Sequence, residues 1–269
     1  MVALQDRLAG EKSGRMSILS LTVLRGLIWV WFGLGLVTFV ALWFVTAPYG
    51  RHSRNGWGPA IPARLGWILM EIPAAATVAA VFLASRRQAG LGAFIFLAMW
   101  ELHYVQRAFV FPFLLPAGAS RMPVWIVALG FVFNVLNGCL QGIWLFRIAP
   151  ARGPEWLSDP RFLPGAALFI GGMALNWHSD AVLRTLREHG ESGYRIPHGG
   201  LYRWVSCPNY LGEVIEWTGW AVATWSLAGA AFAFWTAANL VPRAFSHHRW
   251  YRRNFPGYPE ERRALIPYW

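Results

Sequence analysis

The sequence predicts an all-α, polytopic membrane protein with seven transmembrane helices, and three observations support this fold class. The chain has 269 residues, of which 56% are hydrophobic and only 14% are charged, whereas an ordinary soluble domain carries about 25% charged residues. Seven apolar runs approach the ~20 residues that a spanning helix needs. Pro- and Gly-rich stretches at 48–62, 112–123 and 150–164 are typical of connections between spans. We therefore expect one membrane-embedded domain over residues 1–269.

The expected helices follow from the runs in order. The first run comes after a positively charged start, but it is far longer than the 7–15 residues, roughly, of a signal-peptide core, so it indicates an uncleaved helix. Residues 225–229 predict a tight reversal between the last two helices, and the polar insertion 183–210 predicts a loop over the cytoplasmic mouth. The last three runs are shorter or more polar than the others. The seven runs are 21–47, 65–84, 91–115, 124–146, 163–177, 211–225 and 228–244.

The basic residues predict the orientation. The N-terminal segment and the even-numbered connections hold 8 Lys and Arg residues, whereas the odd-numbered connections and the C-terminal tail hold 14 when Arg243, at the end of the last run, is counted with the tail. The positive-inside rule places the C-terminus in the cytoplasm and the N-terminus outside. Lys12 is the only lysine among 24 basic residues, which hints at a GC-rich bacterial genome. We expect an integral membrane protein of the bacterial inner membrane, or of the endoplasmic reticulum if the source is eukaryotic.

The composition also limits the classes of partner. A nucleic-acid-binding protein would show the net charge of +11 on a soluble domain or tail, but here the basic residues border the spans. Membrane lipid and a phosphorylated ligand fit better, and we expect a monomer that binds no nucleic acid. Cys139 and Cys207 have no metal-site spacing. No GxGxxG motif follows a strand, so a Rossmann cofactor domain is excluded.

Polar residues at helical spacing follow three of the late helices. Ionisable groups at membrane depth are costly and usually mark a functional site, so the stripes predict a largely anionic ligand. For Arg184 and Arg187, snorkelling to lipid headgroups is an equal alternative, and anionic lipid equally explains Arg252 and Arg253. The stripes are Asn176, Asp180, Arg184 and Arg187; Glu213 and Glu216; and Asn239, Arg243, His247 and Tyr251.

Histidines near these stripes raise the question of a metal site. His247 and His248, with His178 and Asp180, have the residue types of a ligand set, but the seven histidines of the chain are scattered and form no HxxxH or HxxHH box. We therefore expect no metal.

Polar residues inside the second and third runs form a second candidate site. A protonated glutamate beside a tyrosine hydroxyl would donate two hydrogen bonds to a carbonyl oxygen, as Glu71 and Tyr104 could. The alternative is an ion pair between Glu71 and Arg107 that holds helices together. In the fourth run, Asn134, Asn137 and Gln141 predict interhelical hydrogen bonds.

Several motifs resemble the C-terminal half of steroid 5α-reductases. They are Asn-Trp-His-Ser-Asp at 176–180, Tyr-Arg-Ile-Pro at 194–197, Gly-Gly-Leu-Tyr at 199–202, Val-Ser-Cys-Pro-Asn-Tyr-Leu-Gly-Glu-Val-Ile-Glu-Trp at 205–217, Ala-Thr-Trp-Ser at 223–226 and Arg-Ala-Leu-Ile-Pro at 263–267. The resemblance covers about residues 170–269 and extends more thinly through 71–73 and 103–104.

This resemblance implies a seven-helix reductase that uses NADPH to reduce the C4=C5 bond of 3-oxo-Δ4 steroids to 5α-steroids. Helices 1–4, in residues 1–147, would mainly form the substrate cavity, and residues 160–269 the NADPH pocket. Glu71 and Tyr104 would hold the 3-oxo group. The cofactor contacts carried over are Arg121, Asn176, Asp180, Arg187, Tyr194, Arg195, Asn209, Glu213, Trp217, Arg243, His247, Tyr251 and Arg262.

One departure from the family concerns substrate preference. Animal steroid reductases have a glutamine before the site glutamate, where this chain has Met70. The Ser-Cys-Pro-Asn-Tyr form also occurs in plant brassinosteroid-pathway reductases and in very-long-chain enoyl-CoA reductases. Alternatives are therefore reduction of another enone, enoyl-CoA or polyprenol lipid, a membrane methyltransferase that uses S-adenosylmethionine, or a sterol-binding protein without enzymatic activity. The Gly-Glu-Val-Ile-Glu-Trp continuation favours steroids.

Overall fold

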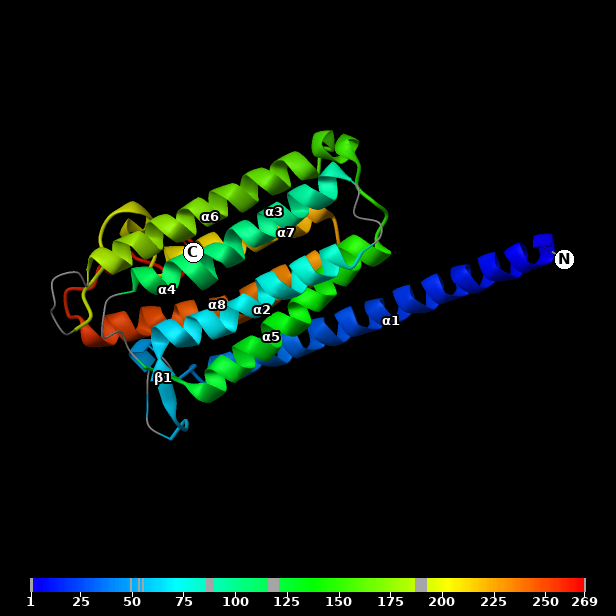
Figure 1. Ribbon diagram of the computed structural model, residues 1–269. Coiled ribbons are helices and arrows are strands. Elements are labelled where there is room, and N and C mark those ends of the chain that lie inside the picture. Colours follow the sequence, from blue (N-terminus) through cyan, green and yellow to red (C-terminus); the bar gives the residue numbers. More distant parts are fainter. Residues whose placement is uncertain are drawn as a thin grey trace.

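The computed structural model describes residues 2–48, 50–52, 54, 56–85, 90–115, 121–186 and 193–268, with side chains from residue 20 onward (Figure 1). Helices run roughly side by side along one bundle, and α1 extends beyond it at its N-terminal end. The C-terminal end of α8, the strand β1 and the loop after α6 lie together at the opposite end, which we call the tail end.

Each of the seven apolar runs falls in a helical segment, so the prediction of an all-α fold is confirmed. The segments are α1 (Val2–Phe44), α2 (Ala63–Leu83), α3 (Leu91–Val105) with a π-helical turn (Gln106–Val110) and α4 (Phe111–Leu114), α5 (Val124–Ile143) with a π-helical turn (Trp144–Ile148), α6 (Phe162–Thr185), α7 (Pro208–Thr224) and α8 (Leu227–Asn254). Short 3-10 turns lie at Gly50–His52, Pro154–Ser158 and Gly200–Arg203, and β1 (Ala60–Pro62) pairs antiparallel with β2 (Arg121–Pro123).

Three helices of the described part of the chain are long and apolar enough to cross a membrane. They are Ser20–Phe44, Ala63–Leu83 and Val124–Ile148. Their outer faces expose large apolar side chains, such as Trp29 at 63% and Trp125 at 63%. A soluble monomer rarely exposes such continuous apolar surface, so these helices are those of a membrane protein.

Four glycines bring α6 and α7 into close contact. A Cβ atom on Gly172 would lie 2.3 Å from the backbone nitrogen of Glu216, and one on Gly212 would lie 2.6 Å from that of Asn176. Gly165 and Gly219 repeat the same arrangement one heptad away, at 2.3 Å from backbone nitrogens of the facing helix. Small residues of this kind let membrane helices approach closely. The seam fixes the Asn176 face of α6 against the Glu216 face of α7.

The predicted reversal between α7 and α8 is confirmed. Trp225 adopts a left-handed conformation (φ 44°) that ends α7. Ser226 then caps α8, because its hydroxyl accepts a hydrogen bond from the backbone N–H of Gly229 at 2.9 Å. The two polar faces that the sequence placed on these helices therefore lie on adjacent antiparallel helices.

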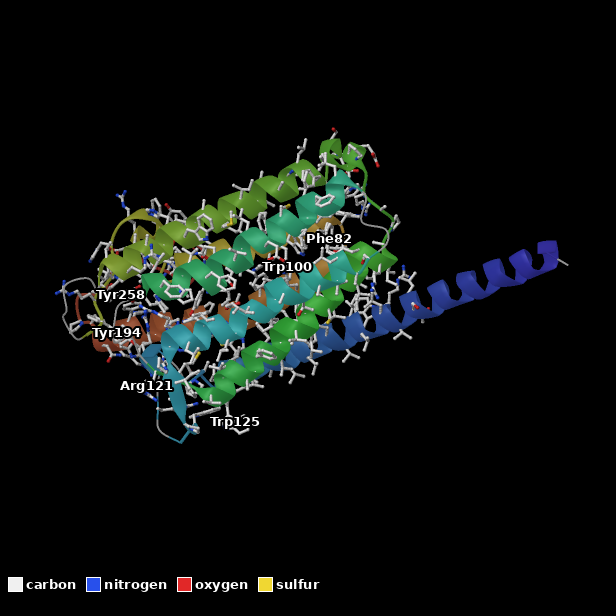
Figure 2. All side chains as sticks on the ribbon, viewed as in Figure 1. Phe82, Trp100, Arg121, Trp125, Tyr194 and Tyr258 are labelled. Carbon is white, nitrogen blue, oxygen red and sulfur yellow. The ribbon has the colours of Figure 1, made fainter. Side chains whose placement is uncertain are left out.

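Aromatic side chains fill the core between α3, α7 and α8. Trp100 is fully buried, lies 5.4 Å from both Trp217 and Trp220 between ring centroids, and donates its indole N–H to the carbonyl of Ala74 at 3.1 Å. Figure 2 shows Trp100 inside the bundle, away from both ends. These aromatic rings support the side chains of His103 and Tyr104, which follow Trp100 on α3.

Two of the three predicted interhelical amides are confirmed. Asn134 donates to the carbonyl of Met70 at 2.6 Å, and Gln141 links α5 to α8 by donating to the carbonyl of Ala228 at 2.7 Å. Gln141 also accepts from the indole N–H of Trp220 at 3.0 Å. The prediction was wrong for Asn137, whose buried amide atoms have no partner among the described residues.

The boundary predicted for the polar insertion was wrong at its start. α6 continues through Thr185, so Leu183 and Arg184 are helical rather than part of a loop. The polar stripe explains the difference, because residues spaced by four extend an amphipathic helix beyond the apolar run. The C-terminal tail is fixed against the end of this insertion, since the hydroxyl of Ser206 contacts His248 Nδ1 at 2.7 Å and the hydroxyl of Tyr258 at 2.6 Å.

Candidate functional site

One large cavity of about 780 Å³ lies inside the bundle. Cavities that hold a drug-sized molecule are typically about 300–1,000 Å³. Its walls come from α1, α2, α3, α5, α6, α7 and α8 and from the turn Gly50–His52. Between α1 and α5 the lining is apolar, as at Leu34, Val37, Leu129 and Val132, and toward the tail end it becomes polar. The site therefore has two chemically different parts.

Glu71 and Tyr104 both line this cavity. Tyr104 is 3% exposed, and its ring packs on Trp100 at 4.8 Å and on Trp217 at 5.7 Å. Glu71 accepts a hydrogen bond from the side-chain amide of Asn134 at 3.3 Å. The structure thus brings the two predicted carbonyl-binding residues to one cavity from different helices.

Arg107 pairs with Asp180 rather than with Glu71. Its Nη1 donates to Oδ2 of Asp180 at 3.3 Å, and its guanidinium lies over the rings of Trp67 and Phe111 at 4.9 and 4.6 Å. Arg107 belongs to the π-helical turn that follows Tyr104, a local geometry that is frequent at functional sites. The alternative of a Glu71–Arg107 pair is therefore replaced by a pair that connects α3 with α6.

His103 and Glu216 form a second buried pair beneath the cavity. His103 Nδ1 and Glu216 Oε1 are 2.7 Å apart, and the side chains are 4% and 0% exposed. The His103 ring contacts Trp217 at 4.6 Å and Tyr104 at 4.9 Å between centroids. His103 also lines the cavity.

A hydrogen-bond network joins α6 and α7 at the polar part of the cavity. The side-chain amide of Asn176 donates to the carbonyl of Asn209 at 3.0 Å, and the side-chain amide of Asn209 donates to Oδ1 of Asp180 at 3.2 Å. Because the glycine seam holds these helices together, the three side chains are preorganised.

Residues of α7 and α8 continue this polar wall. Tyr210 receives a hydrogen bond from Arg243 Nη2 at 3.1 Å, and its hydroxyl lies 3.0 Å from Nε2 of His247. The ring of His247 stacks on that of His52 at 4.9 Å, with ring nitrogens 3.2 Å apart. Burial and the charges of Arg51, Arg243 and Arg54 lower the pKa of His52 to about 4. This region therefore favours negative charge.

Arg51 lies within an aromatic group at the edge of the cavity. Its guanidinium is 4.4 Å from the ring of Tyr251, 5.0 Å from Trp250 and 5.1 Å from Tyr194. Its Nη1 atom is buried and has no partner among the described residues. A buried guanidinium with an unused donor is suited to an anionic ligand.

Ten of the fifteen predicted site residues line the cavity: Glu71, Tyr104, Arg121, Asn176, Asp180, Tyr194, Asn209, Glu213, Arg243 and His247. Figure 2 shows Arg121 and Tyr194 at the tail end. Trp217 and Tyr251 lie behind the cavity wall and support it, Arg262 is buried against Tyr258 and His198, and Arg195 is exposed. Arg187 lies outside the described residues.

Several residues that line the cavity were not predicted from the sequence to be site residues. Arg51 and His52 lie in a connection with no helical period, so no sequence signal assigned them to the site. His103 appeared only within the motif at 103–104 and Arg107 only as an alternative ion-pair partner of Glu71, although ionisable residues inside a span usually mark a functional site. Tyr210 belongs to a recognised motif but was not singled out. These five residues all line the cavity.

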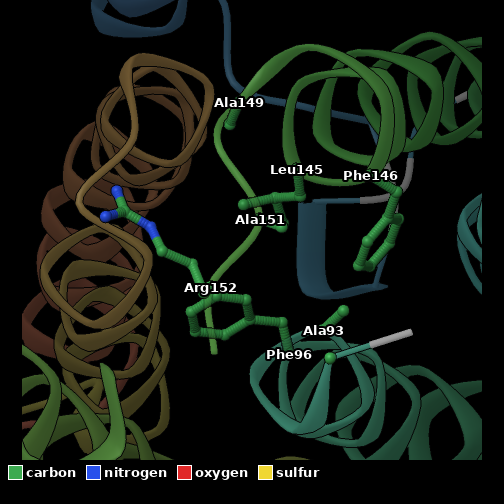
Figure 3. Close-up of a pocket in the computed structure, with 8 residues that line it drawn as sticks. Ala93, Phe96, Leu145, Phe146, Ala149, Ala151 and Arg152 are labelled. Atoms are coloured by element: carbon green, nitrogen blue, oxygen red, sulfur yellow. The ribbon is translucent and has the colours of Figure 1, made fainter. Parts of the chain in front are cut away.

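A second, much smaller cavity lies at the opposite end of the bundle from the tail end. Ala93 and Phe96 of α3 meet Leu145 and Phe146 there, with Arg152 at its edge (Figure 3). Its volume of about 20 Å³ holds about one water molecule. Within the described residues, no group of three or more His, Cys, Asp or Glu side chains could hold a metal ion. The large cavity is therefore the candidate site.

Comparison with known proteins supports one family. The family model described as 3-oxo-5-alpha-steroid 4-dehydrogenase matches residues 120–269. The chain is 45% identical to 3-oxo-5-alpha-steroid 4-dehydrogenase 1 of Bos taurus over 245 residues, which is 87% of this chain and 92% of the relative. It is 42% identical to the enzyme of the same name from Mus musculus over 94% of this chain and 99% of the relative. It is 40% identical to the steroid 5-alpha-reductase DET2 of Gossypium hirsutum over 87% of this chain and 93% of the relative.

Proposed function

The chain belongs to the 3-oxo-5-alpha-steroid 4-dehydrogenase family, and from this membership we propose how its cavity carries out the reaction. The chain is an oxidoreductase that reduces the C4=C5 bond of 3-oxo-Δ4 steroids to 5α-steroids. The division of the cavity into an apolar and a polar part is the observation that supports this function best. A steroid fits the apolar part, and a charged dinucleotide fits the polar part.

Oxidoreductases of this kind take a nicotinamide cofactor, and NADPH is our specific proposal. Five arginines but only three carboxylates line the cavity: Arg51, Arg107, Arg121, Arg184 and Arg243 against Glu71, Asp180 and Glu213. The unpartnered Nη1 of Arg51 is the clearest sign of an anionic ligand, because guanidinium forks match phosphate oxygens. NADPH carries one phosphate more than NADH, which this excess of arginines favours.

Several groups would hold the other parts of the cofactor. The Asn176–Asn209–Asp180 network offers amide donors and a carboxylate acceptor for hydroxyl and amide groups. Tyr194 and Tyr210 present rings and His247 an imidazole on the same wall, and such rings stack on bases. When bound, NADPH would supply the hydride that adds to C5.

Glu71 and Tyr104 would activate the substrate. Hydride addition to the β carbon of an enone places negative charge on the carbonyl oxygen, so donors aimed at that oxygen stabilise the transition state. In this proposal the Tyr104 hydroxyl is the main hydrogen-bond donor to the carbonyl oxygen, and Glu71 orients that hydroxyl or donates a second hydrogen bond. Asn134 fixes Glu71, and the Trp100 and Trp217 rings fix Tyr104. Met70 lines the cavity before Glu71 and supplies an apolar contact at that position.

The membrane arrangement that we propose has seven crossings, with the N-terminus outside and the C-terminus in the cytoplasm. The basic residues of the tail end, including Arg51, Arg121 and Arg243, would then lie on the cytoplasmic side. Soluble NADPH would reach the polar part of the cavity from there.

The test is NADPH oxidation by the purified protein with a panel of 3-oxo-Δ4 steroids, each compared with its 5α-reduced product and with enoyl-CoA thioesters. We expect steroid-dependent oxidation with NADPH and much slower oxidation with NADH. If NADPH binds but no steroid stimulates its oxidation, the substrate claim is wrong. If an enoyl-CoA is the better substrate, the chain is a lipid enoyl reductase. If neither nucleotide binds, the cofactor proposal is wrong.

A further inference from the structure

The reduction of a C4=C5 bond requires a proton at C4. Glu71 and Tyr104 are assigned to the 3-oxo oxygen and do not supply this proton. C5 receives a hydride, with its electron pair, from the reduced nicotinamide, which becomes oxidised. The resulting enolate carries its charge on the 3-oxo group and on C4. A proton must then bond to C4 as the carbonyl re-forms. The source of this proton is a group of the cavity or water, and the inference below rests on the proposed function.

The proton donor must lie close to Tyr104, because C4 is bonded directly to the carbonyl carbon C3. The ionisable side chains of the cavity in this region come from α2, α3, α6 and α7: Glu71, His103, Tyr104, Arg107, Asp180 and Glu213. Glu71 and Tyr104 are assigned to the 3-oxo group, where they bind the carbonyl oxygen. Arg107 and Asp180 are paired with each other, and a guanidinium keeps its protons. His103 and Glu213 therefore remain.

The position of His103 favours it over Glu213. His103 precedes Tyr104 directly, and the two ring centroids are 4.9 Å apart. Glu213 lies one helical turn before Glu216 and interacts with the charge of Arg107. His103 is thus the remaining proton-bearing group with a direct ring contact to the residue that binds the carbonyl.

The orientation of His103 is fixed by its partner. Nδ1 faces Glu216 Oε1 at 2.7 Å, and the edge-on contact with Trp217 at 4.6 Å and 64° holds the ring plane. With Nδ1 occupied, the second nitrogen, Nε2, is the one left to act on a ligand. A carboxylate on one nitrogen of histidine sets the tautomer and stabilises the protonated ring.

The side chain of Glu216 has one hydrogen-bonding partner among the described residues, which is His103. Its side chain is fully buried, and its second oxygen, Oε2, has no partner among the described residues. A buried carboxylate needs a compensating charge or hydrogen bond, and the imidazole of His103 is the partner that the structure provides. The pair therefore holds a proton next to the carbonyl-binding residues.

We propose that His103, oriented by Glu216, donates the proton that C4 receives. The electron pair of the enolate forms the new C4–H bond, the N–H bond at Nε2 breaks, and the neutral imidazole later takes a proton from water. Glu216 is a positioning residue that remains ionised throughout.

The test measures His103→Gln and Glu216→Gln with a 3-oxo-Δ4 steroid in H₂O and in D₂O. We expect His103→Gln to lower kcat by roughly 10²-fold or more, the usual contribution of a general acid. The solvent deuterium isotope effect on kcat rises, because protonation of C4 becomes rate-limiting. The dissociation constant of NADP⁺, measured by calorimetry, stays within threefold of that of the wild type. Glu216→Gln, which keeps a hydrogen-bonding group but removes the charge, shows the same changes to a smaller degree.

His178→Gln is the matched control, since His178 is an exposed histidine of α6 that does not line the cavity. It keeps the wild-type kcat and isotope effect. The inference is overturned if His103→Gln turns over within threefold of the wild type, or if its kcat falls while the isotope effect is unchanged. If His103→Gln does not fold, the isotope effect of Glu216→Gln decides in the same way. If the wild type itself reduces no steroid, the proposed function fails, and that result differs from all of these.

Discussion

The hydroxyl of Tyr104 is the group on which the proposed chemistry depends most. Replacing Tyr104 with Phe keeps the ring that packs on Trp100 and Trp217 and removes only the donor. We expect kcat to fall by about 10²-fold, the usual cost of losing one such donor, while NADP⁺ affinity is unchanged. The measurement is steady-state NADPH oxidation together with calorimetric binding of NADP⁺.

Tyr268→Phe is a matched control, because Tyr268 is 83% exposed and does not line the cavity. It is expected to behave as the wild type. A Tyr104→Phe enzyme with turnover within threefold of the wild type would show that another group activates the carbonyl.

His52 gives the stability of the free protein a specific pH dependence. Its pKa is 6.5 in an unfolded chain and about 4 in the folded one, because of burial and the nearby charges of Arg51, Arg243 and Arg54. Between these values the unfolded state binds more protons, so this contribution is fully present above about pH 6.5 and is lost as the pH falls toward 4. We expect the melting temperature of the ligand-free protein to drop from pH 7 to pH 5, and His52→Gln to reduce that drop. Equal drops in the two proteins would contradict the prediction.

At the scale of single residues, the sequence predicted the part of the site that lies on regular helices. Asn176 and Asp180, spaced by four, line one wall as the helical period requires. Arg51 and His52 were missed because a connection has no period, and only the fold brings them beside α8. Arg262 was carried over by resemblance, and the structure places it behind the cavity, against Tyr258.

At the scale of helices, the α6–α7 seam determines whether the two halves of the polar wall meet. Gly172→Ala would put a Cβ atom 2.3 Å from the backbone nitrogen of Glu216 and 2.5 Å from the carbonyl oxygen of Gly212. These are backbone atoms, so the helices must separate. We expect a loss of roughly 1–3 kcal/mol, as for other overpacked sites, seen as a lower melting temperature, and a weaker NADP⁺ affinity because Asn176 and Asn209 move apart.

The neighbouring glycine is a direct control for that change. A Cβ atom on Gly171 would meet nothing within 4 Å, and alanine is the better helix former by about 1 kcal/mol. Gly171→Ala is therefore expected to leave affinity unchanged and to keep or raise the melting temperature. If the two variants behave alike, close packing at Gly172 is not what holds the wall together.

Helix boundaries show where apolar runs are a sufficient guide and where they are not. The run 228–244 covers only part of α8, which continues to Asn254. The polar stripe that ends at Tyr251 predicted this continuation, and packing such as Tyr210 with His247 stabilises it. The π-helical turn at Gln106–Val110 had no signal in the sequence. Arg107 lies in this turn and pairs with Asp180 of α6. The turn therefore involves a contact between helices that are distant in the sequence.

At the scale of the whole molecule, the two parts of the cavity correspond to two environments. The apolar part lies between α1 and α5, whose outer faces expose large apolar side chains, such as Val30 and Phe131 at 59% and 46%. The polar part lies at the tail end, where Arg51 and Arg243 gather. A hydrophobic substrate can therefore enter the apolar part from the membrane, and a soluble charged cofactor can enter the polar part from the cytoplasm, provided that the tail end faces the cytoplasm.

The orientation is therefore the last prediction, and it can be measured directly. A fluorescent protein fused after residue 269 should be fluorescent in cells, whereas alkaline phosphatase at the same point should be inactive, because the 14 basic residues of this side are retained in the cytoplasm and the 8 of the other side are not. The same two reporters inserted after Arg152, in the connection before α6, are expected to give the opposite result. A phosphatase active at residue 269 and inactive after Arg152 would place the polar part of the cavity away from the cytoplasmic nucleotide pool, and NADPH as the cofactor would then be untenable.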